Sequence, residues 1–230
     1  MSDFLIRFAH PAARGLAALS LLAAACAAHA DGPNMIRNGS FELPDEGADG
    51  LYLGSGDDWF WPSNGALAGP RIIRGNIDDG IGDGMTYGAT HWGNQYLDLA
   101  GESPDGLASD QQMVSGFVAG AKYKFTVWAA NIDNSPVVKL QIKMDNAAGT
   151  VYAKRHIRIP TGGPWNTKIG FKAYSFAFAS PVTGPLWVTL SNHISPFTGG
   201  PAQIAIDNVS LVQVSDDTPV DFVMAPSMGE

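Results

Sequence analysis

The sequence predicts an all-β fold, a two-sheet antiparallel β-sandwich, from three observations. Gly and Pro account for 27 and 15 of the 230 residues and are spread along the chain, as many short strands joined by turns require. Several segments alternate apolar and polar residues with a period of two. No long stretch of the sequence places apolar residues at helical spacing. The number of such segments, roughly ten, is typical of a sandwich.

The first segment, residues 1–30, is a predicted export signal. Arg7 and Arg14 precede an apolar run that ends at 28–30, Ala-His-Ala, a small-x-small sequence that signal peptidase cleaves. The run is too short to remain as a membrane-spanning helix. We therefore expect a secreted or periplasmic protein.

Cys26 is the only cysteine and lies inside the predicted signal. A mature chain that starts at Asp31 then has neither a thiol nor a disulfide, which excludes thiol catalysis and cysteine-ligated zinc. The alternative is a lipoprotein, because Cys26 follows the sequence Leu-Ala-Ala-Ala and lipidation there would tether the chain to a membrane. Only in that case do we expect membrane contact.

Residues 31–214 are expected to form one sandwich domain, followed by a loosely held C-terminal tail at 215–230. In the segment 122–131, Tyr123 and Phe125 alternate with Lys124 and Thr126, which gives the strand one apolar and one polar face. The expected strands are 35–41, 69–75, 94–100, 111–117, 122–131, 137–146, 151–159, 172–180, 186–192 and 202–214.

Two motifs at opposite ends of this domain resemble a known family. The segment NGSFELP at 38–44 and the segment IAIDNVSLVQV at 204–214 resemble the first and last motifs of galactose-binding-like jelly-roll domains. Such domains occur as carbohydrate-binding modules of xylanases and cellulases and as related secreted cell-wall domains of unknown function. The segments 93–101 and 109–131 resemble the middle strands of the secreted cell-wall group. The resemblance implies a jelly roll over nearly the whole mature chain.

The same resemblance implies one structural calcium ion. By position, Glu42 and Asp207 would be its side-chain ligands, and backbone carbonyls near Ser40 would complete the shell. A hard cation with oxygen ligands would neutralise two partly buried carboxylates. In the alternative interpretation, both acids cap turns and face water.

Two tryptophans are candidates for stacking on sugar rings. Alternation places Trp128 and Trp187 on the polar faces of their strands. Gln112, Asn131 and Tyr96 are candidates for hydrogen bonds on the same concave face. In the alternative interpretation, each indole packs under a loop or behind the other sheet.

A second candidate surface lies in the two long irregular segments, 44–69 and 75–94. Both exceed the ordinary length of a connection, and long loops on a sandwich commonly carry binding residues. They contain Trp59 to Pro62 and the pair His91-Trp92. The alternative is that these aromatic side chains close the end of the core.

The predicted function is non-catalytic binding of a cell-wall or extracellular polysaccharide. The formal net charge is −8 and no Lys/Arg cluster stands out, which argues against a nucleic-acid partner. The sequence has no G-x-S-x-G, H-E-x-x-H or phosphate-binding glycine motif. Two alternatives stay open: a structural or adhesive protein that contacts other proteins, and a small polysaccharide hydrolase or lyase.

Overall fold

The computed structural model describes residues 31–45, 51–53, 56–60, 70–74, 90–99, 109–132, 136–161, 170–192 and 203–224. All regular elements in these ranges are β-strands. The described residues therefore contain no helix long and apolar enough to cross a membrane. The predicted export signal, Cys26 and most of the two long irregular segments lie outside the described residues.

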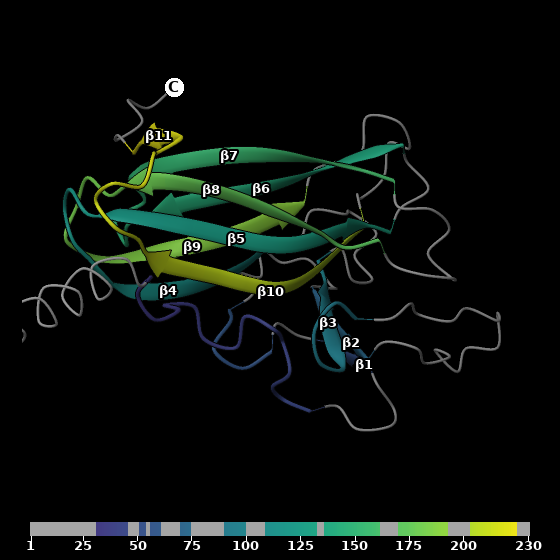
Figure 1. Ribbon diagram of the computed structural model, residues 1–230. Helices are drawn as coiled ribbons and strands as arrows, with labels where there is room; N and C mark the ends of the chain where they lie inside the picture. Colours follow the sequence, from purple (N-terminus) through teal and green to yellow (C-terminus); the bar gives the residue numbers. More distant parts are fainter. Residues whose placement is uncertain are drawn as a thin grey trace, which may run out of the picture.

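The strands form two sheets, as predicted. Within the described residues, sheet A has seven strands in the order β1-β2-β3-β10-β5-β8-β11, and sheet B has four in the order β4-β9-β6-β7. Figure 1 shows the long strands of both sheets side by side, with β1, β2 and β3 grouped at one end of the sandwich. The strands of sheet A are β1 (Leu51–Leu53), β2 (Arg71–Arg74), β3 (Gln95–Asp98), β5 (Lys122–Asn131), β8 (Lys172–Ala179), β10 (Ile204–Gln213) and β11 (Phe222–Val223). Those of sheet B are β4 (Ser109–Phe117), β6 (Val137–Asp145), β7 (Val151–Pro160) and β9 (Gly184–Asn192).

The period-two alternation of the sequence becomes the inner and outer faces of the two sheets. On β5, Phe125 and Val127 are fully buried against the facing sheet, while Lys124 is exposed. On β6, Leu140 and Ile142 are buried in the same core. The prediction of an all-β antiparallel sandwich is therefore confirmed, and every long strand was predicted to within about three residues.

The N-terminal segment 35–41 is not a strand, and this part of the prediction is wrong. Asn38 and Phe41 have φ angles of 44° and 56°, in the left-handed region, which breaks the extended backbone. The segment nevertheless follows β10, because Met35 N–H donates to Leu211 O at 2.8 Å and Val209 N–H donates to Gly39 O at 2.7 Å. Tertiary contacts, and not a ladder, hold it in place.

The first part of the predicted tail is structured, which corrects the expectation that residues 215–230 are loosely held. Strand β11 pairs in parallel with the end of β8, Phe222 beside Phe178. The rings of these two residues stack with centroids 6.0 Å apart, and Met224 is buried. Apolar contacts therefore extend sheet A beyond β8.

We predict that Gly39→Ala is strongly destabilising. A Cβ at Gly39 would lie 2.1 Å from the carbonyl oxygen of Val209, so the segment would have to leave β10. A loss of about 3 kcal/mol, or roughly 6–12 °C in melting temperature, is expected. The control is Gly149→Ala, where φ is +81° but nothing lies within 4 Å, so only the backbone strain of about 1–2 kcal/mol applies. Equal melting temperatures of the two variants would contradict this packing.

Candidate functional site

Glu42 and Asp207 hold one short segment of backbone between them. Glu42 Oε1 accepts hydrogen bonds from the N–H groups of Asn94 and Gln95, each at 2.9 Å. Asp207 Oδ2 accepts from His91 N–H at 3.1 Å and Trp92 N–H at 2.7 Å. The first and last motifs of the domain therefore meet at residues 91–95, which lead into β3 of sheet A. We call this arrangement the carboxylate clamp.

The carboxylate clamp places two acidic groups in a confined space. Asp207 is fully buried, and this burial raises its pKa to about 7, with the negative charge of Glu42 adding to the effect. Hydrogen bonds from the backbone at 91, 92 and 208 oppose the rise in pKa. Glu42 packs directly on Gly93, where a Cβ would approach Oε1 to 2.3 Å. Only glycine fits there, and its φ of +69° also favours glycine.

The predicted metal ligands thus come together in part. Glu42 Oε2 accepts no hydrogen bond within the described residues, and carboxylate oxygens are the hard ligands that calcium prefers. Ser40 lies half-buried in the turn before Phe41. In the part of the chain that the structure describes, no three His, Cys, Asp or Glu side chains gather into a metal-binding group. A calcium ion here would take most of its ligands from backbone carbonyls and water.

Trp128 is covered, as one of the two interpretations of the sequence had it. The imidazole of His91 stacks on the Trp128 indole, with centroids 3.5 Å apart and planes 16° apart, and burial lowers the pKa of His91. The carboxylate clamp fixes the backbone of His91, so this cover is held in place. The next residue, Trp92, points outward and is 63% exposed.

The three predicted hydrogen-bonding residues are buried, so they do not line a concave face. Gln112 exchanges two hydrogen bonds with the backbone of Arg37, each at 2.9 Å, and donates a third to Asp58 O at 3.2 Å. Asn131 donates to the carbonyl of Ile159 at 3.4 Å. Tyr96 is fully buried. Buried polar side chains need such partners, and Gln112 and Asn131 use their amide groups for hydrogen bonds within the fold.

Trp187 lies on a different sheet from Trp128, on the outer face of sheet B. Its cross-strand neighbours are Met113 on β4 and Asp145 on β6. One step along the same face, Thr189 Oγ1 donates to Gln111 Oε1 at 3.5 Å. Trp187 itself is half-buried. An indole here borders a row of polar groups, which is the combination that a sugar ring needs.

Asp145, on the same face, has a carboxylate oxygen that is buried without a hydrogen-bond donor in the described part of the chain. The residue is 9% exposed, and its Oδ2 forms an ion pair with Lys143 Nζ at 3.0 Å. Its other oxygen, Oδ1, is buried and has no hydrogen-bond partner among the described residues. A buried acceptor without a partner costs about 1–3 kcal/mol. We call Trp187, Asp145, Lys143, Thr189 and Gln111 together the Trp187 site.

Sequence reasoning found Trp187 and missed Asp145 and Lys143. Alternation along β6 places both on its outer face, but this holds for every second residue of the strand. What selects them is the pairing of β6 with β9, which the sequence does not specify.

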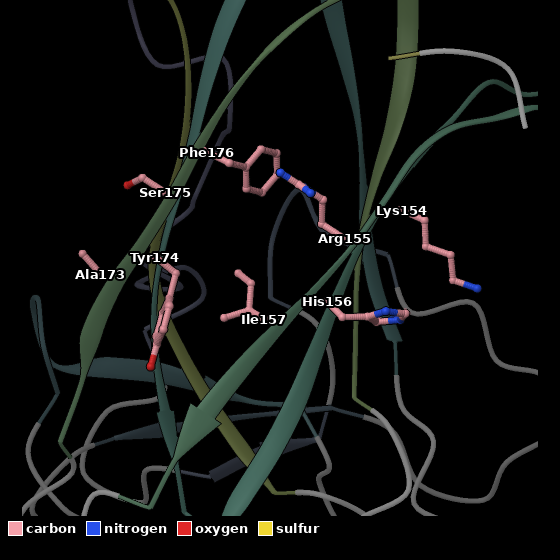
Figure 2. A pocket seen from close by; sticks show the side chains of 8 residues that line it. All are labelled: Lys154, Arg155, His156, Ile157, Ala173, Tyr174, Ser175 and Phe176. Atoms are coloured by element: carbon pink, nitrogen blue, oxygen red, sulfur yellow. The ribbon is translucent and has the colours of Figure 1, made fainter. Parts of the chain in front are cut away.

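A separate pocket of about 510 Å³ opens between β7, the edge strand of sheet B, and β8 of sheet A. Figure 2 shows Arg155, Ile157, Tyr174 and Phe176 pointing into the space between these strands, while Lys154 and His156 point away from it. The guanidinium of Arg155 lies 4.3 Å from the centroid of the Phe222 ring, a cation–π contact. None of the residues predicted from the sequence lines this pocket.

Comparison with known proteins gives fold similarity alone. No protein-family model matches the chain, and no curated protein matches it. Among solved structures, TmCBM61 in complex with β-1,4-galactotriose has 18% identity and a TM-score of 0.47, with 79% of this chain and 99% of that chain covered. The CBM22-1 xylan-binding domain of Paenibacillus barcinonensis Xyn10C has 11% identity and a TM-score of 0.48, with 80% and 96% covered. An arabinose-bound MgGH51 α-L-arabinofuranosidase has 14% identity and a TM-score of 0.42, with 78% of this chain and 29% of that chain covered.

We predict a pH dependence of stability from the carboxylate clamp. Between pH 3.8 and about 7 the folded protein keeps a proton on Asp207 that the unfolded chain has released. The free energy of unfolding in EDTA should therefore fall as pH rises through this window, by up to about 4 kcal/mol from this group. Asp207→Asn should flatten that part of the profile, measured by urea unfolding from about pH 4 to 7.5. Parallel profiles for wild type and variant would contradict the raised pKa.

Proposed function

We propose that this chain is an exported, non-catalytic carbohydrate-binding protein that holds a sugar on the outer face of sheet B, at the Trp187 site. The observation that carries the proposal is Asp145 Oδ1, a buried carboxylate oxygen to which nothing in the described part of the chain donates a hydrogen bond. Asp145 lies directly across from the half-buried Trp187. A ligand hydroxyl supplies the missing donor.

The residues of the Trp187 site are proposed to make different contributions to sugar binding. The indole gives a flat apolar surface for the C–H face of a pyranose ring. Asp145 accepts a hydrogen bond from a ring hydroxyl when its side chain turns to expose Oδ1, which is buried in this structure, where Oδ2 pairs with Lys143 Nζ at 3.0 Å. Gln111, half-buried in the adjacent row, adds one amide on the same face, and the buried Thr189 donates a hydrogen bond to its Oε1 at 3.5 Å.

The same arrangement supports the proposal of binding without hydrolysis. Glycoside hydrolysis uses two carboxyl groups flanking the bond, about 5–9.5 Å apart. At the Trp187 site, the charged neighbour of Asp145 is Lys143, a cation. Release of reducing or unsaturated ends from a bound polysaccharide would overturn the non-catalytic assignment in favour of the hydrolase or lyase alternative.

We predict that Trp187→Ala weakens polysaccharide binding about tenfold or more, since it removes the stacking surface. Asp145→Asn should weaken binding as well, because an amide in place of the carboxylate loses a charge-assisted hydrogen bond. Affinity gel electrophoresis and calorimetry on a polysaccharide panel measure both effects. Trp128→Ala is the matched control, because this indole is already covered by His91. If a folded protein binds no polysaccharide in the panel, the structural or adhesive alternative takes its place.

A second candidate surface is the exposed indole of Trp92. A tryptophan that is 63% exposed on a backbone segment fixed by the carboxylate clamp is available for a partner. Trp92→Ala separates the two surfaces. Loss of binding in this variant, with Trp187→Ala unchanged, would move the sugar site to the 91–95 segment.

The calcium ion remains part of the proposal, at the carboxylate clamp. Two neighbouring carboxylates, one of them fully buried with a raised pKa, supply hard oxygen ligands and leave negative charge that a cation would neutralise. When bound, calcium would supply charge neutralisation and cross-link the two ends of the domain.

We predict that chelation at pH 7.5 lowers the melting temperature by several degrees if calcium binds there, since the ion binds only the folded state. Glu42→Gln should abolish this sensitivity, because it removes one of the two charges. Addition of magnesium in place of calcium serves as the control for ionic strength. A melting curve that is identical with and without chelator would rule out a structural metal at the clamp.

A further inference from the structure

Strands β6 and β7 gather basic side chains on the outer face of sheet B. Three successive cross-strand pairs share that face: Lys139 with Arg158, Gln141 with His156, and Lys143 with Lys154. We call these six residues the basic ladder. This cluster was not predicted from the sequence, because alternation along one strand does not show which residues of the next strand lie opposite.

The basic ladder sets like charges directly opposite each other. Lys139 faces Arg158 and Lys143 faces Lys154, with side chains whose Cβ atoms are about 5 Å apart in such pairs. Like-charged pairs at this spacing are destabilising. Within the described residues, the acidic contact of the ladder is the ion pair of Lys143 with Asp145. The other two lysines and Arg158 are exposed.

Protection of a sheet edge explains only half of this pattern. Edge strands commonly carry Lys or other charges that prevent pairing with another chain, and β7 is the edge strand of sheet B. Strand β6, however, lies between β9 and β7 and has no free edge. Lys139 and Lys143 therefore have no such role, although they complete both like-charged pairs.

The basic ladder is continuous with the Trp187 site. Lys143 pairs with Asp145 across from Trp187 and also lies opposite Lys154 on β7. Figure 2 shows Lys154 and His156 directed away from the β7–β8 pocket. A chain that stacks on Trp187 and continues toward β7 therefore crosses a row of cations.

We infer that the polysaccharide bound at the Trp187 site is acidic, with carboxylate or sulfate groups that the basic ladder neutralises. This inference rests on the proposed function and adds the chemical class of the ligand. A polyanion placed between the like-charged pairs removes their repulsion and gains charge-assisted hydrogen bonds from Arg158 and the lysines. Because the formal net charge of the chain is −8, attraction for a polyanion is local to the ladder and is not a property of the molecule as a whole.

The test compares four ligands with one charge variant. Polygalacturonate carries carboxylates, dextran sulfate carries sulfates, galactan is neutral, and duplex DNA is a polyanion without a sugar chain of this kind. Lys139→Gln combined with Arg158→Gln removes one like-charged pair and leaves the Trp187 site intact. Lys124→Gln combined with Lys172→Gln, two exposed lysines of sheet A, is the matched control.

The ladder variant should bind the acidic polysaccharide about tenfold more weakly and galactan as wild type does, while the control variant binds both as wild type does. Wild-type binding to the acidic chain should weaken as NaCl rises from about 50 mM to about 500 mM. Tighter binding of polygalacturonate would identify carboxylate as the recognised group, and tighter binding of dextran sulfate would identify sulfate. Without ligand, the ladder variant should melt about 1–3 °C higher than wild type, since the repulsion is gone.

Each failure has a separate signature. If the ladder variant binds all polysaccharides as wild type does while Trp187→Ala loses binding, the acidic ligand is refuted and the sugar site stands. If Trp187→Ala has no effect on any polysaccharide, the proposed function itself fails. If DNA binds as tightly as the acidic polysaccharide and loses affinity in the ladder variant, the surface recognises polyanions in general, and the inference is overturned.

Discussion

The pairing of β6 with β9 on one side and β7 on the other is the constraint from which the functional surface follows. Its register places Asp145 across from Trp187 and Lys143 across from Lys154. A slip of one residue would exchange the inner and outer faces of β6, and would bury its lysines in a core now filled by Leu140 and Ile142. The apolar core between the sheets therefore fixes the positions of Lys143 and Asp145 on the outer face, although neither side chain is part of that core.

The carboxylate clamp organises the opposite face in a different way. Glu42 and Asp207 come from the two ends of the domain and bind the same stretch of backbone, and that stretch lays His91 over Trp128. The ring of Trp128 is thus covered by His91 and is not available for stacking on a ligand. Trp187, on sheet B, has polar neighbours on its own face. Two tryptophans that look alike in the sequence have different surroundings because only Trp128 faces a segment held by the buried Asp207 and the half-buried Glu42.

Local patterns in the sequence were sufficient for the fold and insufficient for the site. Alternation predicted the long strands, since burial of one face of a strand leaves a period of two in its own residues. It could not predict the irregular path of 35–41, where contacts with β10 accompany the positive φ angles of Asn38 and Phe41. It also assigned Gln112 to an outer face, because a polar residue on the core side of a strand looks like a surface residue until its backbone partners are known. The contact of Asp145 with Trp187 depends on pairing between β6 and β9, which are distant in the sequence and carry no local signal for it. The basic ladder depends on the register of the β6–β7 hairpin, which alternation along either strand does not fix.

The most direct test of a sugar site at Trp187 is a ¹⁵N-resolved NMR titration of residues 31–230 with an oligosaccharide, following the indole N–H resonances of the tryptophans. The account predicts a saturable shift of the Trp187 indole together with the amides of Lys143 and Asp145, while the Trp128 indole under His91 stays in place. Saturable shifts confined to Trp92 and its neighbours, with Trp187 unmoved, would contradict it.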